Sequence, residues 1–240
     1  MANVVLAERW TCTNLRDVGG PRTRSGRRLR QGLLYRSDSL HRLTPPETDR
    51  FVRSLSPRTV IDLRSADEVL RLGVGHFGQR VRHVHLPIGI APDGRKSRRR
   101  TPSLLDLYLE FAEASGPAFA DVVRVLGSRA ALPAVVFCAA GKDRTGIAIA
   151  LVLGALNVTD EDIVTDYART RRVDPAALGS GYERYFAEMP SAYREAAPAT
   201  MSGFLTALQR EHGSVRAYLA GHGVRADDLG ALERALLTEE

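Results

Sequence analysis

The stretch Val135-Val136-Phe137-Cys138-Ala139-Ala140-Gly141-Lys142-Asp143-Arg144-Thr145-Gly146 decides how the rest of the chain is interpreted. An apolar run rich in β-forming residues leads into a short loop that begins with a cysteine and ends with an arginine, and small and apolar residues follow as far as Leu156. This order predicts a strand, a tight loop and a helix. Helix N-termini attract anions, because their first N–H groups are unpaired and the helix dipole is positive there.

The spacing within the loop suits a phosphate group. Five residues between Cys138 and Arg144 are enough to surround a tetrahedral anion with backbone N–H groups. A cysteine at a helix N-terminus ionises more readily than a free one, and its thiolate is a nucleophile. Arg144 offers a planar guanidinium that matches two phosphoryl oxygens. We therefore expect covalent phosphoryl transfer through Cys138, with substrate bound by Ala139, Ala140, Gly141, Lys142, Thr145 and Gly146.

Two loop residues have more specific expected roles. Gly141 lacks a Cβ, which lets the loop turn and approach the ligand closely. The hydroxyl of Thr145 is placed to donate a hydrogen bond to the sulfur of Cys138, which would stabilise that sulfur as a leaving group.

The composition is that of a globular protein. Hydrophobic residues make up 44% and charged residues 26% of the 240 residues, and no Pro/Gly/Ser-rich linker divides them, so we expect one domain over residues 1–240. The two cysteines, Cys12 and Cys138, cannot form a disulfide framework, and a reactive thiolate needs reducing surroundings. The first residues lack a basic leader, which argues against a signal peptide. A cytoplasmic location is predicted, with export by a route without a signal peptide left open.

The formal net charge of +6 favours acidic partners such as phosphoproteins or the anionic headgroups of a membrane surface. Residues 93–101 hold five basic side chains, which are either a solvated loop or a rim that attracts phosphorylated substrate. Nucleic-acid motifs and zinc-ligand spacings are missing from the sequence, so we expect no nucleic-acid partner, metal or cofactor. The oligomeric state is not predicted.

The segments around the loop predict an α/β fold with a central, mostly parallel sheet flanked by helices. Residues 59–63 are β-branched and apolar, as in a buried parallel strand, and Asp62 and Arg64 lie at its carboxyl end, where ligands of such sheets bind. Further strands are predicted at residues 33–37 and 81–86. Helices are predicted near residues 44–55, 67–71, 102–114, 117–126, 144–156, 159–167 and 227–237, and Gly213-Ser214 is expected to end one helix and cap another.

Three segments in this order resemble the protein tyrosine and dual-specificity phosphatase superfamily. The loop matches its Cys-x5-Arg-Thr signature, and Gly-Lys-Asp-Arg-Thr-Gly is similar to the bacterial group of the mycobacterial tyrosine phosphatase B type. Asn14-Leu15-Arg16-Asp17-Val18-Gly19-Gly20 and Val60-Ile61-Asp62-Leu63-Arg64-Ser65, with Glu68 after it, match the same group. The resemblance implies a metal-independent phosphatase of phosphotyrosine, and after it of phosphoserine, phosphothreonine and phosphoinositides. It also implies a helical lid, whose counterpart is the segment at about 174–200.

The resemblance leaves several residue roles open. The general acid that protonates the leaving group is either Asp143, inside the loop, or Asp62, which could instead be structural and tie Arg64 or a loop amide. Lys142 is either a second cation at the phosphate, as in phosphoinositide phosphatases, or a solvated surface lysine. Asn14, Arg16 and Asp17 are expected to support the loop through hydrogen bonds, or else to form a simple turn, and Arg64 is expected to bind substrate.

One position departs from the family pattern. The histidine that usually precedes the cysteine is Phe137 here, and that histidine helps to hold the loop and to lower the pKa of the thiol. We expect reduced or shifted activity at most, because the loop amides and the helix N-terminus remain. The alternatives are a non-catalytic phosphate-binding module, or pseudophosphatase, and a rhodanese-like sulfurtransferase. Intact Cys138 and Arg144 argue against the first, and the Arg-Thr ending of the loop against the second.

Overall fold

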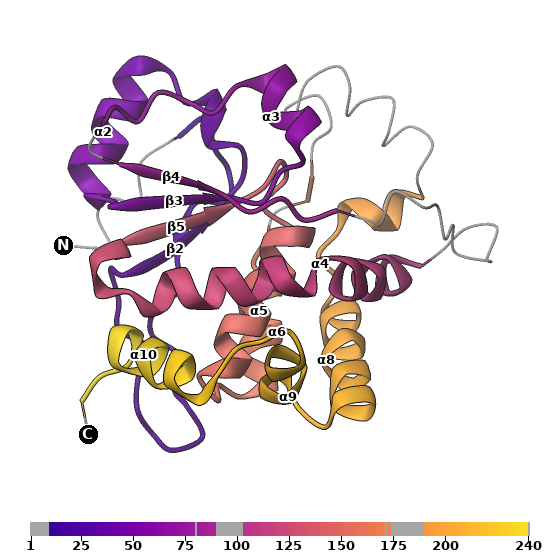
Figure 1. Cartoon of the computed structure of the whole chain (residues 1–240). Coiled ribbons are helices and arrows are strands. Elements are labelled where there is room, and N and C mark those ends of the chain that lie inside the picture. The colour runs from indigo at the N-terminus through magenta and orange to yellow at the C-terminus, as the bar shows by residue number, and fades with distance from the viewer. Residues whose placement is uncertain (1–9, 80, 90–102, 171, 174–189, 240) are drawn as a thin grey trace.

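The computed structural model describes residues 10–79, 81–89, 103–170, 172–173 and 190–239 (Figure 1). The basic segment at 93–101 lies outside the described residues. So does most of the predicted lid, at 174–189, including the aromatic residues at 182, 185 and 186.

A five-stranded sheet forms the centre of the structure, in the order β1-β2-β5-β3-β4. Strands β2 to β5 are parallel in their pairings, and β1 is antiparallel to β2 at one edge. The prediction of a mostly parallel sheet is therefore confirmed. The central strand is the one that leads into the Cys138 loop. The strands are β1 (Arg16–Asp17), β2 (Leu34–Ser37), β3 (Thr59–Asp62), β4 (Arg82–His85) and β5 (Ala134–Phe137).

Helices cover both faces of the sheet, as predicted (Figure 1). Helices α2 (Pro45–Leu55) and α3 (Ala66–Leu72) lie on one face. The other face carries α4 (Leu104–Gly127), α5 (Asp143–Ala155), α6 (Asp160–Ala168), α8 (Pro198–His212), α9 (Val215–Gly221) and α10 (Ala226–Leu236). Short 3-10 turns occupy Leu40–Arg42, Arg129–Ala131 and Ser191–Arg194.

The interruption predicted between two helices in residues 102–126 is present within α4, whose two helical parts meet at a kink. Its kink lies at Ser115, which has a non-helical backbone (φ −120°, ψ 21°), two residues before Pro117. Proline within a helix lacks the N–H for an i−4 hydrogen bond and its ring crowds the preceding turn, so the helical backbone is interrupted there and its direction changes.

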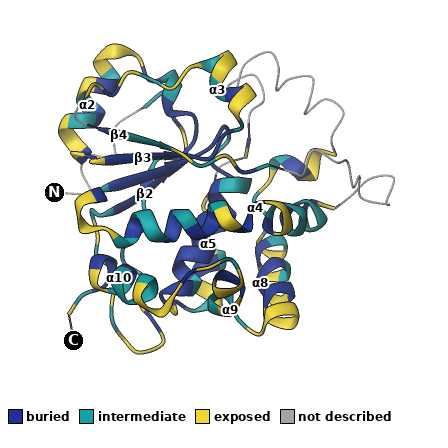
Figure 2. Cartoon of the chain, viewed as in Figure 1, coloured by how far each residue is buried: buried dark blue, intermediate teal, exposed yellow. Residues whose placement is uncertain are grey.

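Alternating strand residues divide the core in two. Side chains of a strand point to opposite faces in turn, and in β5 Ala134 and Val136 join the larger core with α4 and α5, whereas Val135 and Phe137 join the smaller core with α2. Helix α5 is buried along nearly its whole length, whereas the outer faces of α2 and α3 are exposed (Figure 2). The loop after β5 is thus held between two packed layers. Among the described helices, none combines the length and apolar character that crossing a bilayer requires.

Candidate active site

The predicted loop connects the central strand directly to a helix N-terminus. Strand β5 ends at Phe137 and α5 begins at Asp143, so residues 138–142 form the connection. Cys138 has an exposed fraction of only 2%. The strand–loop–helix order predicted from the sequence is confirmed. It brings the thiol to the positive end of α5.

Three successive carbonyl groups of the loop are held by residues from outside it. Ser39 donates from its N–H (3.1 Å) and its Oγ (2.6 Å) to the oxygen of Ala139. Asn14 Nδ2 donates to the oxygen of Ala140 at 3.0 Å, and Arg36 Nη2 donates to that of Gly141 at 2.9 Å.

This arrangement directs the loop amides inward. In a planar trans peptide the C=O and the following N–H point in opposite directions. Fixing the carbonyls of residues 139–141 on the outside therefore turns the N–H groups of residues 140–142 toward the inside. Those N–H groups have no hydrogen-bond acceptor within the described part of the chain. A ring of inward N–H groups at a helix N-terminus is an anion-binding site.

A buried ion cluster lies behind the loop. Asp166 of α6 accepts from Arg36 Nη1 at 2.5 Å and from Arg16 Nε at 3.1 Å. Burial favours the neutral carboxyl, but the two guanidinium groups outweigh it and lower the pKa of Asp166. Burial, and after it the charge of Arg36, lowers the pKa of Arg16 to about 10, which leaves it protonated at neutral pH. Arg16 Nη1 also donates to the oxygen of Asn14 at 3.4 Å, so the cluster reaches the loop from two sides.

The three motif residues expected to support the loop act differently. Asn14 contacts the loop directly, as predicted, whereas Arg16 is bound to α6 and acts through Asp166. Asp17 forms a turn, since its carboxylate accepts from the N–H groups of Gly19 and Gly32, both at 2.7 Å. Arg36, which makes the third contact to the loop, was missed by sequence reasoning. A lone arginine inside an apolar strand was the available signal.

Gly141 is required by the neighbouring strand. It has φ +64°, and a Cβ at this position would lie 2.5 Å from the oxygen of Ser37 and 2.7 Å from the nitrogen of Asp38. The predicted turn is confirmed. The loop was expected to approach the ligand closely at Gly141. In the structure Gly141 approaches the backbone at the end of β2, a contact that the sequence did not indicate.

Arg144 is held in place by Glu68 of α3. Its Nη1 and Nη2 donate to the two carboxylate oxygens at 2.5 and 2.8 Å. The same carboxylate accepts from the N–H of Ser65 at 2.7 Å, which closes the capping box at the start of α3. A two-point contact between planar groups fixes the orientation of the guanidinium. Glu68 was recognised only as part of a motif, and the Ser-x-x-Glu capping pattern was the signal for its position.

The hydroxyl of Thr145 is fully buried and has no hydrogen-bond partner among the described residues. The predicted bond to the sulfur of Cys138 is therefore not formed in this structure. A buried hydroxyl without a partner is unfavourable, so its donor remains available for a group that enters the loop.

Asp62 and Arg64 form a buried pair, which argues against the expected substrate contact of Arg64 and against the general-acid alternative for Asp62. Both side chains have an exposed fraction of 0%. Arg64 donates to Asp62 from Nε at 2.9 Å and from Nη2 at 2.6 Å, and also to Nδ1 of His41 and to the oxygen of Gly73. Burial favours the neutral carboxyl, but hydrogen bonds from His83 and Arg64 outweigh it and lower the pKa of Asp62. This geometry matches the structural alternative, in which Asp62 ties Arg64.

Asp143 and Lys142 lie together at the start of α5. Asp143 Oδ1 accepts from Lys142 Nζ at 2.9 Å and from the hydroxyl of Tyr108 at 2.7 Å, and 22% of its side chain is exposed. Lys142 is fully buried, so the prediction of a solvated surface lysine is wrong. Its Nζ donates to the oxygens of Tyr193 (2.5 Å) and Glu195 (3.3 Å).

The segment that contains the Cys138 loop and its supporting residues also matches a known protein family. The model of the tyrosine phosphatase family matches residues 9–238. The chain belongs to the tyrosine phosphatase family.

Two curated relatives of this chain are named as protein phosphatases. A Cupriavidus necator protein named as a tyrosine-protein phosphatase is 35% identical over 172 residues, which cover 68% of this chain and 62% of that protein. The triple specificity protein phosphatase PtpB of Mycobacterium tuberculosis is 32% identical over 189 residues, covering 65% of this chain and 66% of PtpB. The chain thus spans just under two thirds of the length of each.

A solved structure, the core catalytic domain of the PP-IP phosphatase SIW14 of S. cerevisiae, aligns over 74% of the present chain and 86% of the SIW14 chain. Its sequence identity is 13% and its TM-score 0.43. These values are too low to support any further conclusion.

Phe137 replaces the histidine that is usual before the cysteine in phosphatases of this type. Its ring is fully buried in the smaller core, and the guanidinium carbon of Arg64 lies 5.3 Å from the ring centre. A cation over an aromatic face is favourable. The side chain therefore points away from the loop. The contacts that hold the loop come from Ser39, Asn14 and Arg36.

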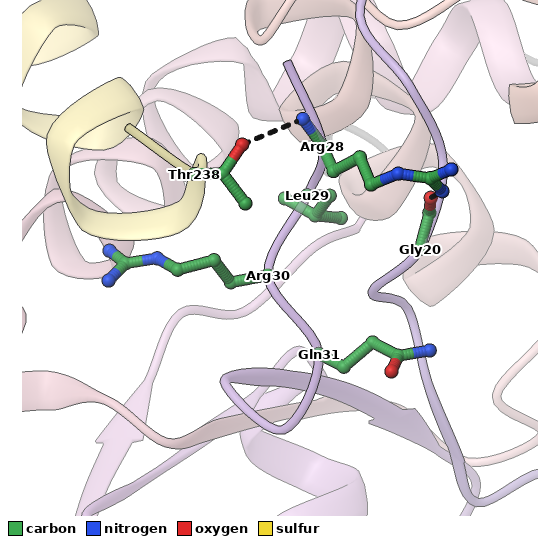
Figure 3. A pocket seen from close by; sticks show the side chains of 6 residues that line it. All are labelled: Gly20, Arg28, Leu29, Arg30, Gln31 and Thr238. Carbon is green, nitrogen blue, oxygen red and sulfur yellow. Dashed lines mark hydrogen bonds between the residues drawn. The ribbon is translucent and has the colours of Figure 1, made fainter. Parts of the chain in front are cut away.

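A separate surface hollow does not resemble an anion site of a phosphatase (Figure 3). Its lining residues 28–31 precede β2, at the N-terminal end of the parallel strands, whereas the Cys138 loop lies at their C-terminal end. The side chains of Arg28 and Arg30 extend in different directions in Figure 3 and donate to the backbone oxygens of Gly20 and Arg234. The hollow is lined by Gly20, Arg28, Leu29, Arg30, Gln31 and Thr238. Within the described ranges, three or more His, Cys, Asp or Glu side chains nowhere gather as a metal site would require.

Proposed function

We propose that the protein is a metal-independent phosphomonoester hydrolase that acts through a cysteinyl-phosphate intermediate. The observation that carries this proposal is the loop itself. Its carbonyls at 139–141 are bound from outside, its N–H groups face inward, and Cys138 lies at its base with Arg144 held by Glu68. Such preorganised donors stabilise the charge that develops on a transferred phosphoryl group.

In the first step the thiolate of Cys138 attacks phosphorus, and the bond from phosphorus to the leaving oxygen breaks. The leaving oxygen takes a proton from a carboxylic acid. In the second step a water molecule attacks phosphorus and gives a proton to the resulting carboxylate, while the S–P bond breaks and inorganic phosphate forms. The buried Thr145 hydroxyl would then donate to the departing sulfur.

The proposed general acid is Asp143. Its side chain is partly exposed and belongs to the first turn of α5, beside the loop. Asp62 is the weaker candidate, because it is fully buried and both of its oxygens accept from Arg64. Asp143 is also paired, with Lys142, but in the described part of the chain it accepts through Oδ1 alone, so Oδ2 is left to carry a proton to the leaving oxygen.

The proposed substrates are phosphotyrosine proteins first, then phosphoserine, phosphothreonine and phosphoinositides. Family membership supports the first, and the triple specificity named for PtpB supports a wider range. A net charge of +6 favours acidic substrates and an anionic membrane surface. A cytoplasmic location and a single domain over residues 1–240 stay predictions.

The test is turnover of p-nitrophenyl phosphate in the presence of EDTA. Wild-type protein should hydrolyse it, and Cys138→Ser should abolish the hydrolysis while inorganic phosphate still binds. Mass spectrometry of a quenched reaction should find a phosphate adduct of about 80 Da on the peptide with Cys138, as expected for a covalent intermediate. Phosphate binding without any turnover by the wild type would indicate the pseudophosphatase alternative.

A further inference from the structure

The ammonium group of Lys142 has all of its donors engaged within the protein. A lysine ammonium has three N–H donors and no acceptor. Lys142 Nζ contacts three acceptors, which are Asp143 Oδ1 (2.9 Å), the oxygen of Tyr193 (2.5 Å) and the oxygen of Glu195 (3.3 Å). A fully buried ammonium is stable only when it is paired and hydrogen-bonded, and these three partners satisfy it.

This coordination is inconsistent with a second phosphate-binding cation. To reach a phosphoryl oxygen, Lys142 would have to release one of its partners, and a backbone carbonyl left without a donor in a buried site is costly. The prediction that Lys142 resembles the basic residue of phosphoinositide phosphatases is therefore not supported by its contacts. Its neighbours give it a different role.

Lys142 connects two elements that are distant in sequence. One is the start of α5, through Asp143, and the other is the segment at 190–197, which follows the undescribed residues 174–189. Asp143 is held from the other side by the Tyr108 hydroxyl, which in turn contacts the hydroxyl of Tyr167 at 2.7 Å. Two donors of different kind thus converge on one oxygen of Asp143.

We propose that Lys142 is a positioning residue that fixes the carboxylate of Asp143 and fastens the segment 190–197 to the phosphate loop, and that it does not bind the substrate. The proposal rests on the proposed function, because it takes Asp143 as the general acid. A fixed acid delivers its proton over a short, defined distance. Loss of Lys142 should therefore impair protonation of poor leaving groups, whereas phosphate binding should be unaffected.

The experiment uses Lys142→Met, which retains length and apolar bulk and removes the ammonium. Tyr108→Phe is the matched variant, because it removes the other donor to the same oxygen of Asp143 without touching residues 190–197. Tyr167→Phe removes the bond to the Tyr108 hydroxyl and leaves both donors to Asp143 in place. Three quantities are measured for each protein: kcat on phenyl phosphate and on p-nitrophenyl phosphate, the inhibition constant of inorganic phosphate, and hydrogen exchange of the backbone at 190–197.

We expect Lys142→Met to lower kcat about tenfold more on phenyl phosphate than on p-nitrophenyl phosphate. This loss is smaller than the whole rate contribution of a general acid, because Asp143 is still present but less well positioned. The inhibition constant of phosphate should change less than about twofold, and exchange at 190–197 should become faster. Tyr108→Phe should reproduce the kinetic selectivity and leave the exchange unchanged. Tyr167→Phe should change neither by more than about twofold, because it alters only the second bond from the acid.

A rise of about tenfold or more in the phosphate inhibition constant, with both substrates slowed equally, would overturn the proposal and identify Lys142 as a phosphate ligand. So would a wild-type crystal soaked in orthovanadate in which Nζ lies within hydrogen-bond distance of a vanadate oxygen, a measurement that does not depend on the variant folding. Loss of turnover in Cys138→Ser tests the proposed function separately. If Asp143→Asn shows no leaving-group selectivity, the acid assignment fails, and with it the positioning role.

Discussion

Arg144 and Glu68 meet through two parallel contacts, from Nη1 to Oε2 at 2.5 Å and from Nη2 to Oε1 at 2.8 Å. The arginine belongs to the first turn of α5 and the glutamate to α3, so the pair joins helices on opposite faces of the sheet (Figure 1). The guanidinium is thereby oriented before any phosphate enters.

The first prediction concerns this pair. Glu68→Gln removes the charge but retains a side chain that can still cap α3, so it isolates the contact to Arg144. We expect kcat/KM for p-nitrophenyl phosphate to fall about tenfold, because the guanidinium loses its fixed orientation. Ser65→Ala is the control, which should cost about 1 kcal/mol of unfolding free energy with kcat/KM unchanged. Equal kinetic losses in both variants would contradict the orienting role.

The second prediction concerns Asp62. Asp62→Asn leaves Arg64 as a buried charge without its partner, and breaking a buried pair costs about 3–5 kcal/mol of unfolding free energy. Chemical denaturation should measure this loss. The ratio of kcat on phenyl phosphate to kcat on p-nitrophenyl phosphate should equal that of the wild type. A selective loss on phenyl phosphate in this variant, but not in Asp143→Asn, would return the general-acid role to Asp62.

The third prediction concerns Asn14 and the loop carbonyls. Asn14→Ala removes the donor to the oxygen of Ala140 and should weaken orthovanadate binding about five- to tenfold, the effect of one lost hydrogen bond on loop shape. Asp17 lies in the same motif, but its carboxylate accepts from the N–H groups of Gly19 and Gly32 and makes no hydrogen bond to the loop within the described ranges. Asp17→Asn should lower the unfolding temperature while orthovanadate affinity stays at the wild-type level. Loss of affinity in Asp17→Asn alone would refute the assignment.

The fourth prediction concerns Gly141. Gly141→Ala places a Cβ 2.5 Å from the oxygen of Ser37, at a positive φ that alanine disfavours. The loop must shift, and we expect kcat/KM to fall at least about a hundredfold, since small misplacements of catalytic groups have such effects. Gly26 is the matched control, because it also has positive φ (+91°) but no atom within 4 Å of its Cβ position. Gly26→Ala should reduce stability by about 1–2 kcal/mol with activity retained.

The fifth prediction concerns pH and His41. Burial, and after it the charge of Arg64, lowers the pKa of His41 from its ordinary value of 6.5 to about 4. Between these two pH values the unfolded chain binds a proton that the folded protein does not. The unfolding free energy should therefore fall as the pH decreases from about 6.5 to 4, and below pH 4 His41 should cause no further decrease. His41→Asn retains an acceptor for Arg64 and does not titrate. Its stability should fall less over this range, and an identical pH profile in both proteins would contradict the prediction.

Much of the fold could be predicted because its signals are local. Thr44-Pro45-Pro46-Glu47 begins α2 with a capping box, and the β-branched run at 59–62 is β3. These signals depend on neighbours within a few residues. The break predicted at Gly116-Pro117 is the kink of α4, which lies one residue earlier, at Ser115.

The sequence by itself determined the chemistry of the site. Cys138, Gly141 and Arg144 lie in one short stretch of the chain, and the strand–loop–helix order around them follows from residue type alone. The tertiary structure decided which charged side chains face the substrate. Lys142, Arg64, Asp62 and Arg16 all carry charges near the loop in sequence or topology, yet each is bound to a partner within the protein. Only packing reveals such partners, because a buried charge is stabilised by groups that the fold brings from distant segments.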